Sequence, residues 1–381
     1  MAKDSPTPRQ SSRTFLLVSC GLVGIVLNCW IATINSGSWD VDFNQYYSAG
    51  KLVGSGHLYD RAAIESLELQ HTKAVPFGRI PAFALAFRPL SLLPYEPARA
   101  VWLVIGVAAL AGFVWLWPLA DRAWAVVAIC WSAPAAMCLS FGQDSVLFLF
   151  FATVGIRLLI AERDFWSGVA ISACIGKPHL ALLFPVLMIA RGRWRAVFGG
   201  VAGVAASVLI SFAAEGRDWI QQLVALSRIP EFDPAAQHMP NLRGLLSFTS
   251  AGLGIEAAIG VVVAAAIFYL SQRQSLAVAG ALVISAGLML GHHGYFYDAV
   301  LLLPALLLTV QTPHPEWLRA WALLLFTPLP FMMLLTSLGL VAQIALNGFT
   351  LALITMTLMS TVMQSPSRRD LVPPRADATG A

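Results

Sequence analysis

Charged residues are scarce in this chain. Lys, Arg, Asp and Glu together make up 12% of its 381 residues, while hydrophobic residues make up 58%. An average soluble domain carries about 25% charged residues, so a soluble globular fold is excluded because too much apolar surface would stay in contact with water. The formal net charge is only +4, which gives no sign of a nucleic-acid-binding surface. We therefore expect no nucleic-acid partner.

Cysteine pairs and nucleotide-binding motifs are also missing. The five cysteines show no CxxC pair and no metal-ligand spacing, and all lie inside apolar runs, as small core residues do. The chain has no phosphate-cradling glycine loop and no Ser-His-Asp order. We expect neither a metal site nor a cofactor, and a mechanism based on a soluble nucleotide sugar or ATP finds no support.

Long apolar runs take the place of the missing charges, and each is close to the roughly 20 residues that cross a bilayer. The sequence therefore predicts an all-α polytopic membrane protein with one transmembrane domain over 14–363, between disordered cytoplasmic ends at 1–13 and 364–381. The expected apolar segments are 14–34, 98–118, 123–140, 145–161, 166–190, 196–213, 253–270, 275–291, 295–311, 319–339 and 342–363.

Short loops that carry Lys or Arg predict which ends of these segments face the cytoplasm. The arginines within 191–195 fit that side only if the segment 166–190 enters the membrane and returns to the same face. Pro178 breaks a helix in the middle of this segment, and the neighbouring Lys177 is costly in lipid unless it lines a polar cavity. We therefore expect two half-helices that meet at Lys177 and Pro178.

A polar cluster follows the first apolar run, within an expected extracytoplasmic loop at 35–80; a second such loop is expected at 214–250. Asp42 opens a stretch of aromatic and small residues that is typical of a helix lying in the membrane interface. A carboxylate in low-dielectric surroundings is a competent base. The presence of Asp42 is also explained if the residue caps a helix or lies in a solvated loop. Asp42 is the candidate general base, ahead of its neighbour Asp40.

Two further polar groups interrupt the apolar segments. Gln143 and Asp144 follow Gly142, either as a tight turn with an N-cap or as part of a site. Lys177 and His179 lie in the middle of an apolar segment. The lysine there needs a partner, for which an anionic headgroup or an aspartate would serve.

Histidines and arginines beside the apolar runs are candidates for phosphate contacts. His292 and His293 lack the HxxxH or HExxH spacing of a metal site. They are consistent with phosphate binding or with a hydrogen bond to Asp42, although an interfacial aromatic belt explains the nearby tyrosines equally well. Arg79 and Arg88 could hold a phosphate, but arginines at an interface more commonly extend their charge into the headgroups.

In combination these motifs resemble glycosyltransferase family 87, the polyprenyl-phosphate-mannose-dependent α-mannosyltransferase-like membrane proteins. The segments 42–50 (DFNQYYSAG) and 56–60 (GHLYD) resemble the family's D-x-x-x-Y-Y-x-A and G-x-x-L-Y-D opening. Ile80, where an aromatic residue is usual, and Asp144, where Asn is common, depart from the pattern. The segments that resemble later family motifs, in the family's order and within roughly 15–310, are 81–94, 142–143, 168 with 177–178, 193–195 and 292–298.

The resemblance implies a GT-C fold, which is a multispan helical fold with re-entrant or broken helices and an extracytoplasmic active site. It also implies an enzyme of the inner (plasma) membrane that transfers a hexose, by family habit mannose, from a polyprenyl-phosphate sugar to a glycolipid or glycan acceptor with inversion. Asp42 would take the proton of the acceptor hydroxyl. The donor and its phosphate would be bound by Lys177, His292, His293, Arg79 and Arg88, and the sugar or acceptor pocket would include Tyr46, Gln143 and His179.

Two other functions compete with this interpretation. A transporter or flippase of lipid-linked saccharides would also carry broken helices and charges at mid-membrane depth, although the chain shows none of the inverted repeats that transporters often have. A non-catalytic membrane subunit would be favoured by loss of the family's aspartate, but Asp42 is present.

Overall fold

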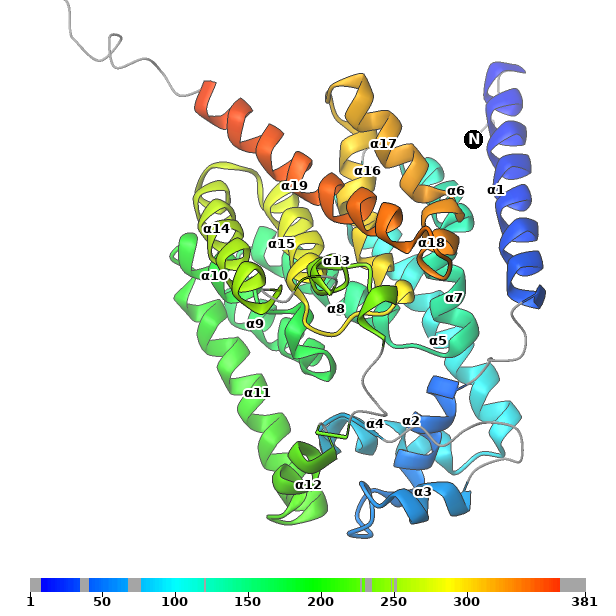
Figure 1. Cartoon of the computed structure of the whole chain (residues 1–381), viewed down its shortest axis with the longest axis vertical. Helices are drawn as coiled ribbons and strands as arrows, with labels where there is room; N and C mark the ends of the chain where they lie inside the picture. The colour runs from blue at the N-terminus through cyan, green and yellow to red at the C-terminus, as the bar shows by residue number, and fades with distance from the viewer. Residues whose placement is uncertain are drawn as a thin grey trace, which may run out of the picture.

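The computed structural model describes residues 8–34, 41–67, 77–119, 121–226, 228–229, 235–247, 249 and 252–363. Asp40 and the tail 364–381 lie outside these ranges. Within them the chain forms α-helices and short 3-10 helices, and no strand (Figure 1). The first helix, α1, starts at Pro8, ahead of the expected start at residue 14.

Among the described residues, four helices are long and apolar enough to cross a membrane by length and composition, and a bent pair would add a fifth span. The four are α5 (Tyr95–Leu116), α11 (Trp194–Glu215), α14 (Gly252–Arg273) and α19 (Gly339–Met363). The pair, α6 (Arg122–Trp131) and α7 (Ala133–Phe141), is bent by 66°. Further apolar helices are α1 (Pro8–Ile34), α8 (Ser145–Ile160), α15 (Leu276–Leu290), and η6 (Phe296–Leu302) continued by α16 (Leu303–Gln311). The predicted all-α polytopic membrane protein is confirmed.

One expected span is broken. The sequence predicts a single apolar segment over 319–339, but the chain forms α17 (Glu316–Phe326) and then α18 (Leu329–Leu334). Pro328 explains the break, because it pushes the residue before it, Thr327, out of helical geometry. Pro330 lies in the first turn of α18, where the missing N–H costs no hydrogen bond. Each proline therefore occupies the start of a helix rather than the middle of one.

The segment over 166–190 has the predicted broken form. It consists of α9 (Asp164–Ser172), the 3-10 turns η2 (Ala173–Gly176) and η3 (Pro178–Leu180), and α10 (Phe184–Ala190). Asp164 at the start of α9 forms an ion pair of 3.4 Å with Arg193, which precedes α11. The chain therefore enters the bundle with α9 and returns to the same end with α10, as expected.

Helices α9 and α11 run side by side in the same direction at very close range. A Cβ added to Gly168 would lie 1.9 Å from the carbonyl oxygen of Ala196, and a Cβ added to Gly199 would lie 2.0 Å from that of Phe165. Only glycine permits this approach, as in other membrane helix pairs where small residues let the backbones touch. This packing fixes the depth of the re-entrant segment.

Several turns meet at the end of the bundle where α9 begins. Arg191 donates a hydrogen bond to the carbonyl of Gln274, which joins the α10–α11 turn to the α14–α15 turn. The amide of Gln311 donates to the carbonyl of Asp121 at 3.0 Å, which joins the end of α16 to the start of α6. Many of the chain's arginines lie on these turns, and this end is called the arginine end below.

Four shorter helices lie at the opposite end (Figure 1), where buried residues of α2, α4 and α12 form a separate aromatic cluster with the start of α5. Phe43, Tyr46, Phe87 and Trp102 pack there around α2, with ring centroids 4.6–6.5 Å apart. Most of α2 is buried, so it is enclosed by protein more fully than the interfacial helix that the sequence predicts. The four helices are α2 (Val41–Leu52), α3 (Arg61–Leu67), α4 (Pro81–Ser91) and α12 (Trp219–Leu226).

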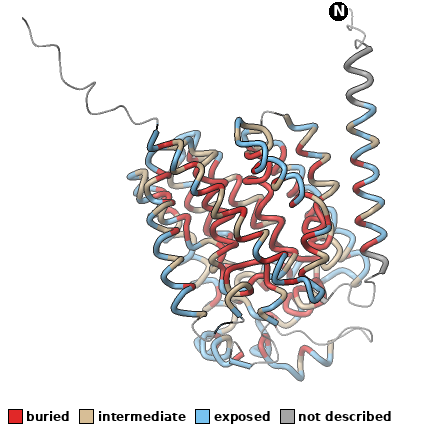
Figure 2. Tube along the Cα trace, turned by 45° about the horizontal axis from the view of Figure 1, so that its top comes forward, coloured by how far each residue is buried: buried red, intermediate tan, exposed pale blue. Residues whose placement is uncertain are grey.

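Burial is concentrated in the middle of the bundle. Every residue from Ala279 to Met289 of α15 is buried, whereas most described residues of α1 are exposed or half-buried (Figure 2). Helix α1 packs against α6, where Asn28 donates a hydrogen bond of 2.9 Å to the carbonyl of Cys130. Exposed apolar faces of this kind are expected of helices that contact lipid.

The glycine contact between α9 and α11 gives a test of the packing. Gly199→Ala should destabilise the protein by about 1–3 kcal/mol, the usual cost of overpacking, because the new methyl group must push α9 away. The measurement is the apparent Tm of the purified protein in detergent. Gly254→Ala is the matched control, since a Cβ there meets no atom within 4 Å. Equal Tm values for the two variants would contradict the close parallel packing.

The re-entrant path gives a test of topology. Single cysteines at Arg163, Arg193 and Arg217, in a background without the native cysteines, should divide into two groups when labelled with a membrane-impermeant thiol reagent. Arg163 and Arg193 should react from one side and Arg217, beyond the end of α11, from the other. Reaction of Arg163 and Arg193 from different sides would show that 164–190 crosses the membrane once.

Candidate active site

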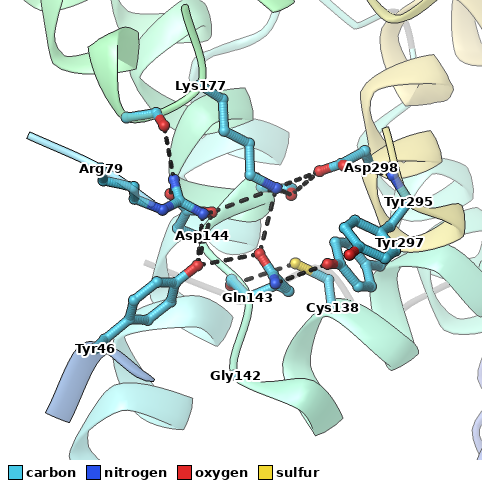
Figure 3. A network of polar contacts seen from close by, with 12 residues as sticks. Tyr46, Arg79, Cys138, Gly142, Gln143, Asp144, Lys177, Tyr295, Tyr297 and Asp298 are labelled. Carbon is cyan, nitrogen blue, oxygen red and sulfur yellow. Dashed lines mark hydrogen bonds and ion pairs between the residues drawn. The ribbon is translucent and has the colours of Figure 1, made fainter. Parts of the chain in front are cut away.

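Five segments that are distant in sequence bring polar side chains together in one network (Figure 3). They are α2, the residues 77–80 before α4, the α7–α8 turn, the η2–η3 junction and η6. Tyr46, Arg79, Asp144, Lys177 and Asp298 are the anchoring side chains, one from each segment. The broken form of α9–α10 is what brings a lysine to this depth.

The α7–α8 turn supplies an amide at the centre of the site. Gly142 ends α7 with φ +71°, and a Cβ there would lie 2.5 Å from Cβ of Phe43, so glycine lets α2 approach the turn. The next residue, Gln143, accepts hydrogen bonds at Oε1 from Tyr46 at 3.2 Å and from Lys177 at 3.3 Å, and donates from Nε2 to the hydroxyl of Tyr297 at 2.8 Å. These partners fix which way the amide points.

Arg79 and Asp144 form the first buried ion pair. The Arg79 guanidinium donates to both carboxylate oxygens of Asp144, at 2.5 and 3.0 Å, in the two-point geometry that arginine favours. It also donates to the hydroxyl of Tyr46 at 2.7 Å and to the carbonyl of Gly176 at 2.9 Å. One guanidinium therefore links α2, the α7–α8 turn and η2.

Lys177 and Asp298 form the second buried ion pair. Their side chains are only 8% and 2% exposed, and the Lys177 ammonium also contacts Asp144 at 3.4 Å and the hydroxyl of Ser145 at 2.7 Å. Ser145 in turn donates to Asp298. Breaking a buried pair by removing one partner is strongly destabilising in general, so this pair holds η6 and the re-entrant segment together.

Asp42 differs from the other two carboxylates. It is partly accessible, and among the described residues it makes no ion pair. Burial raises its pKa to about 6, although a hydrogen bond with the Gln143 side chain and the positive charges of Lys177 and Arg79 oppose the rise. A carboxylate with a pKa close to the working pH can both take and release a proton, as a general base must.

The three predicted histidines lie together beside Lys177. The ring centroids of His179 and His293 are 6.2 Å apart, and those of His292 and His293 are 5.0 Å apart. His292 also faces the carboxylate of Glu256 at 3.8 Å, and Arg243 approaches the same carboxylate at 3.9 Å. This row of rings extends from the buried ion pairs towards a second charged group on α13 (Leu242–Leu246) and α14.

Arg88 lies apart from the other predicted site residues. It belongs to the last turn of α4, and its guanidinium donates to the carbonyl of Val53 at 3.3 Å, near the turn that precedes α3. The 56–60 motif forms part of that turn, where His57 and Asp60 are exposed and 3.4 Å apart. These residues border the aromatic cluster rather than the buried ion pairs.

Sequence reasoning did not place Asp298, Tyr297 or Glu256 among the site residues, and it left Asp144 open between an N-cap and a site role. Asp144, Glu256 and Asp298 each lie inside or beside an apolar run. That position is a usable signal, because acidic residues at such depth are rare and normally paired. Among the described residues no group of His, Cys, Asp and Glu is suited to hold a metal ion.

Comparison with known proteins gives one curated relative. The chain is 25% identical over 202 residues to the polyprenol-phosphate-mannose-dependent alpha-(1-2)-phosphatidylinositol pentamannoside mannosyltransferase of Mycolicibacterium smegmatis. The match covers 50% of this chain and 46% of the relative, so the chain spans about half the length of that protein. No solved structure matches significantly.

The family comparison covers the middle of the chain. The model of glycosyltransferase family 87 matches residues 81–292, which include the α7–α8 turn and the whole re-entrant segment. The resemblance seen in the sequence motifs is therefore confirmed. Since the match extends over more than half of the 381 residues, this chain belongs to glycosyltransferase family 87.

Proposed function

We propose that this protein transfers a hexose, mannose in the first instance, from a polyprenyl-phosphate sugar to a glycolipid or glycan acceptor. The observation that carries the proposal is the position of Asp42, a partly accessible carboxylate with a pKa near 6, beside two buried cation–carboxylate pairs. Family membership and the name of the mycobacterial relative support a membrane glycosyltransferase and a lipid-phosphate mannose donor.

In the proposed reaction Asp42 removes the proton from the acceptor hydroxyl. The freed oxygen attacks the anomeric carbon of the donor sugar, and the bond from that carbon to the phosphate oxygen breaks with inversion. Negative charge grows on the departing lipid phosphate, so fixed positive charges near it lower the barrier. Asp42 then releases its proton before the next cycle, which its pKa near 6 permits at neutral pH.

Arg79 and Lys177 are the proposed fixed charges. Both are nearly buried and are held in place by ion pairs with Asp144 and Asp298. Their donors are already oriented, which is the condition under which such groups stabilise developing charge best. The more accessible His292 and His293 are proposed to contact the phosphate directly, and Arg88 is left as a more distant contact.

The three remaining predicted site residues differ in exposure, because two are buried and one is partly exposed. Tyr46 is fully buried and Gln143 is 4% exposed, and both use their polar atoms within the protein. We assign them the task of holding Asp42 and Arg79 in place at the wall of the sugar pocket. His179 is partly exposed, and it is the one proposed to reach the sugar or the acceptor.

The arginine end supports the proposed orientation. Loops rich in Lys and Arg face the cytoplasm, and α11 leads from this end to the end where α2, α4 and α12 lie. The site around Asp42 would then face the periplasm or the exterior, with the protein in the inner membrane. A donor with its lipid tail in the bilayer and its sugar among the outer polar groups suits that arrangement.

Asp42→Asn should lower turnover by about 10²–10⁴-fold, the usual contribution of a general base, while donor binding persists. In the parent enzyme kcat/KM should fall as the pH drops below about 6, because protonated Asp42 cannot accept the acceptor's proton. The Asn variant should lose this acidic limb. The measurement is transfer of labelled mannose from polyprenyl-phosphate mannose by purified protein.

Asp218→Asn is the matched control for that experiment, because it removes an exposed carboxylate beyond the end of α11. It should leave both rate and pH profile unchanged. A fully active Asp42→Asn enzyme would rule out Asp42 as the base. If both variants moved lipid-linked sugar across vesicles without transferring it, the transport alternative would replace the proposal.

Lys177→Met should weaken use of the lipid-phosphate donor strongly, because it removes a positive charge from the site and leaves Asp298 unpaired. The double variant with Asp298→Asn removes the unpaired carboxylate and should restore folding but not donor use. The readouts are apparent Tm and kcat/KM for the donor. Recovery of both in the double variant would show that Lys177 serves only to hold η6.

A further inference from the structure

A hollow lined by arginines opens at the arginine end, away from the proposed active site. Its volume is about 550 Å³, and its wall is formed by Asp164 and the segment 191–195. A second hollow of about 380 Å³ adjoins it, lined by 162–166 and Arg195. The two share Asp164 and Arg195, so they form one groove around the starts of α9 and α11.

Positive charge is in excess in this groove. Its lining contains four arginines against Glu162 and Asp164. Arg193 faces Asp164 at 3.4 Å, and Arg191 is hydrogen-bonded to the carbonyl of Gln274. Arg195 is exposed, and its guanidinium has no hydrogen bond or ion pair within the described part of the chain. An anion in the groove would supply the missing partner, and arginine is well suited to phosphate because it can donate two parallel hydrogen bonds.

Large exposed aromatic side chains indicate how deep this groove lies in the membrane. Trp166 and Trp194 are 61% and 64% exposed, and Phe198, one turn into α11, is 67% exposed. Trp residues of membrane helices concentrate where the hydrocarbon core meets the headgroups. Trp166 and Trp194 themselves line the two hollows. The arginines therefore lie at the height of lipid phosphates, with apolar contacts for acyl chains beside them.

The N-terminal ends of α9 and α11 add to the positive potential in the groove. Arg163 and Arg193 are the N-cap residues of α9 and α11, and neither side chain caps its helix. The parallel helices place two positive dipole ends beside the arginines, where another cation is unfavourable and an anion is favourable. The lining charges and the exposed aromatics remain the main observations, because a helix end alone does not specify a ligand.

From these contacts we propose that the groove binds the headgroup of an anionic phospholipid of the leaflet at the arginine end. Arg195 and Arg193 hold the phosphate, and Trp194, Trp166 and Phe198 contact the glycerol and upper acyl chains. This site is separate from the proposed reaction, since it lies at the opposite end of α11 from α2 and α12. A free phosphate shares the headgroup chemistry, but it would not use the exposed aromatic residues.

The test is native mass spectrometry of the full-length protein released from detergent with phosphatidylglycerol or phosphatidylcholine of the same acyl chains. The parent should retain phosphatidylglycerol at least about tenfold more readily, since each basic residue near a membrane surface adds appreciably to anionic lipid binding. Arg193→Gln/Arg195→Gln should lose most of that preference. Arg319→Gln, which removes a charge outside the groove, should keep it.

Three outcomes would overturn the proposal. The first is equal retention of the two lipids by the parent, and the second is an unchanged preference in the double variant. The third is an equal rise in apparent Tm with inorganic phosphate as with phosphatidylglycerol, dependent on the same arginines, which would identify a soluble anion as the ligand. If the double variant is unstable without lipid, the single variant Arg195→Gln decides, because Arg195 is exposed and leaves no partner behind.

Discussion

The pairing of Lys177 with Asp298, and of Arg79 with Asp144, is the interaction on which the arrangement of this molecule depends. Each charge would be expensive in an apolar bundle by itself, and each pair draws its members from segments far apart in the chain. Lys177 joins the re-entrant segment to η6, and Arg79 joins the segment before α4 to the α7–α8 turn. The helices around the site are therefore positioned by electrostatic contacts as well as by apolar packing.

This arrangement leaves one carboxylate less constrained than its neighbours. Asp144 and Asp298 are tied to cations, while Asp42 contacts Gln143 and is partly accessible. Gln143 is itself fixed by Tyr46, Lys177 and Tyr297, so the paired charges orient the side chain that Asp42 meets. The two paired carboxylates and the proposed base thus belong to one network, and they differ in their contacts and in their exposure.

Much of the fold follows from the sequence, because bilayer-length apolar runs and a proline beside a buried lysine have few physical solutions. The re-entrant segment was expected from Lys177, Pro178 and the arginines at 191–195, and it is present. The break between α17 and α18 was missed, since Pro328 was read within one apolar run. The partners of Lys177 could not be named from the sequence, because Asp298 is 121 residues away and only tertiary packing brings it near. The role of Asp42 stays a prediction.

The order of the buried pairs along the chain also has a consequence for biosynthesis. Proteins are made from the N-terminus, and early segments begin to fold before later ones exist. Arg79 and Asp144 both precede the re-entrant segment, so the first ion pair can close before that segment is made. Lys177 must then wait for Asp298, which leaves the ribosome only after α11, α14 and α15. Until that moment the nascent bundle holds a lysine whose main counter-charge has yet to be synthesised.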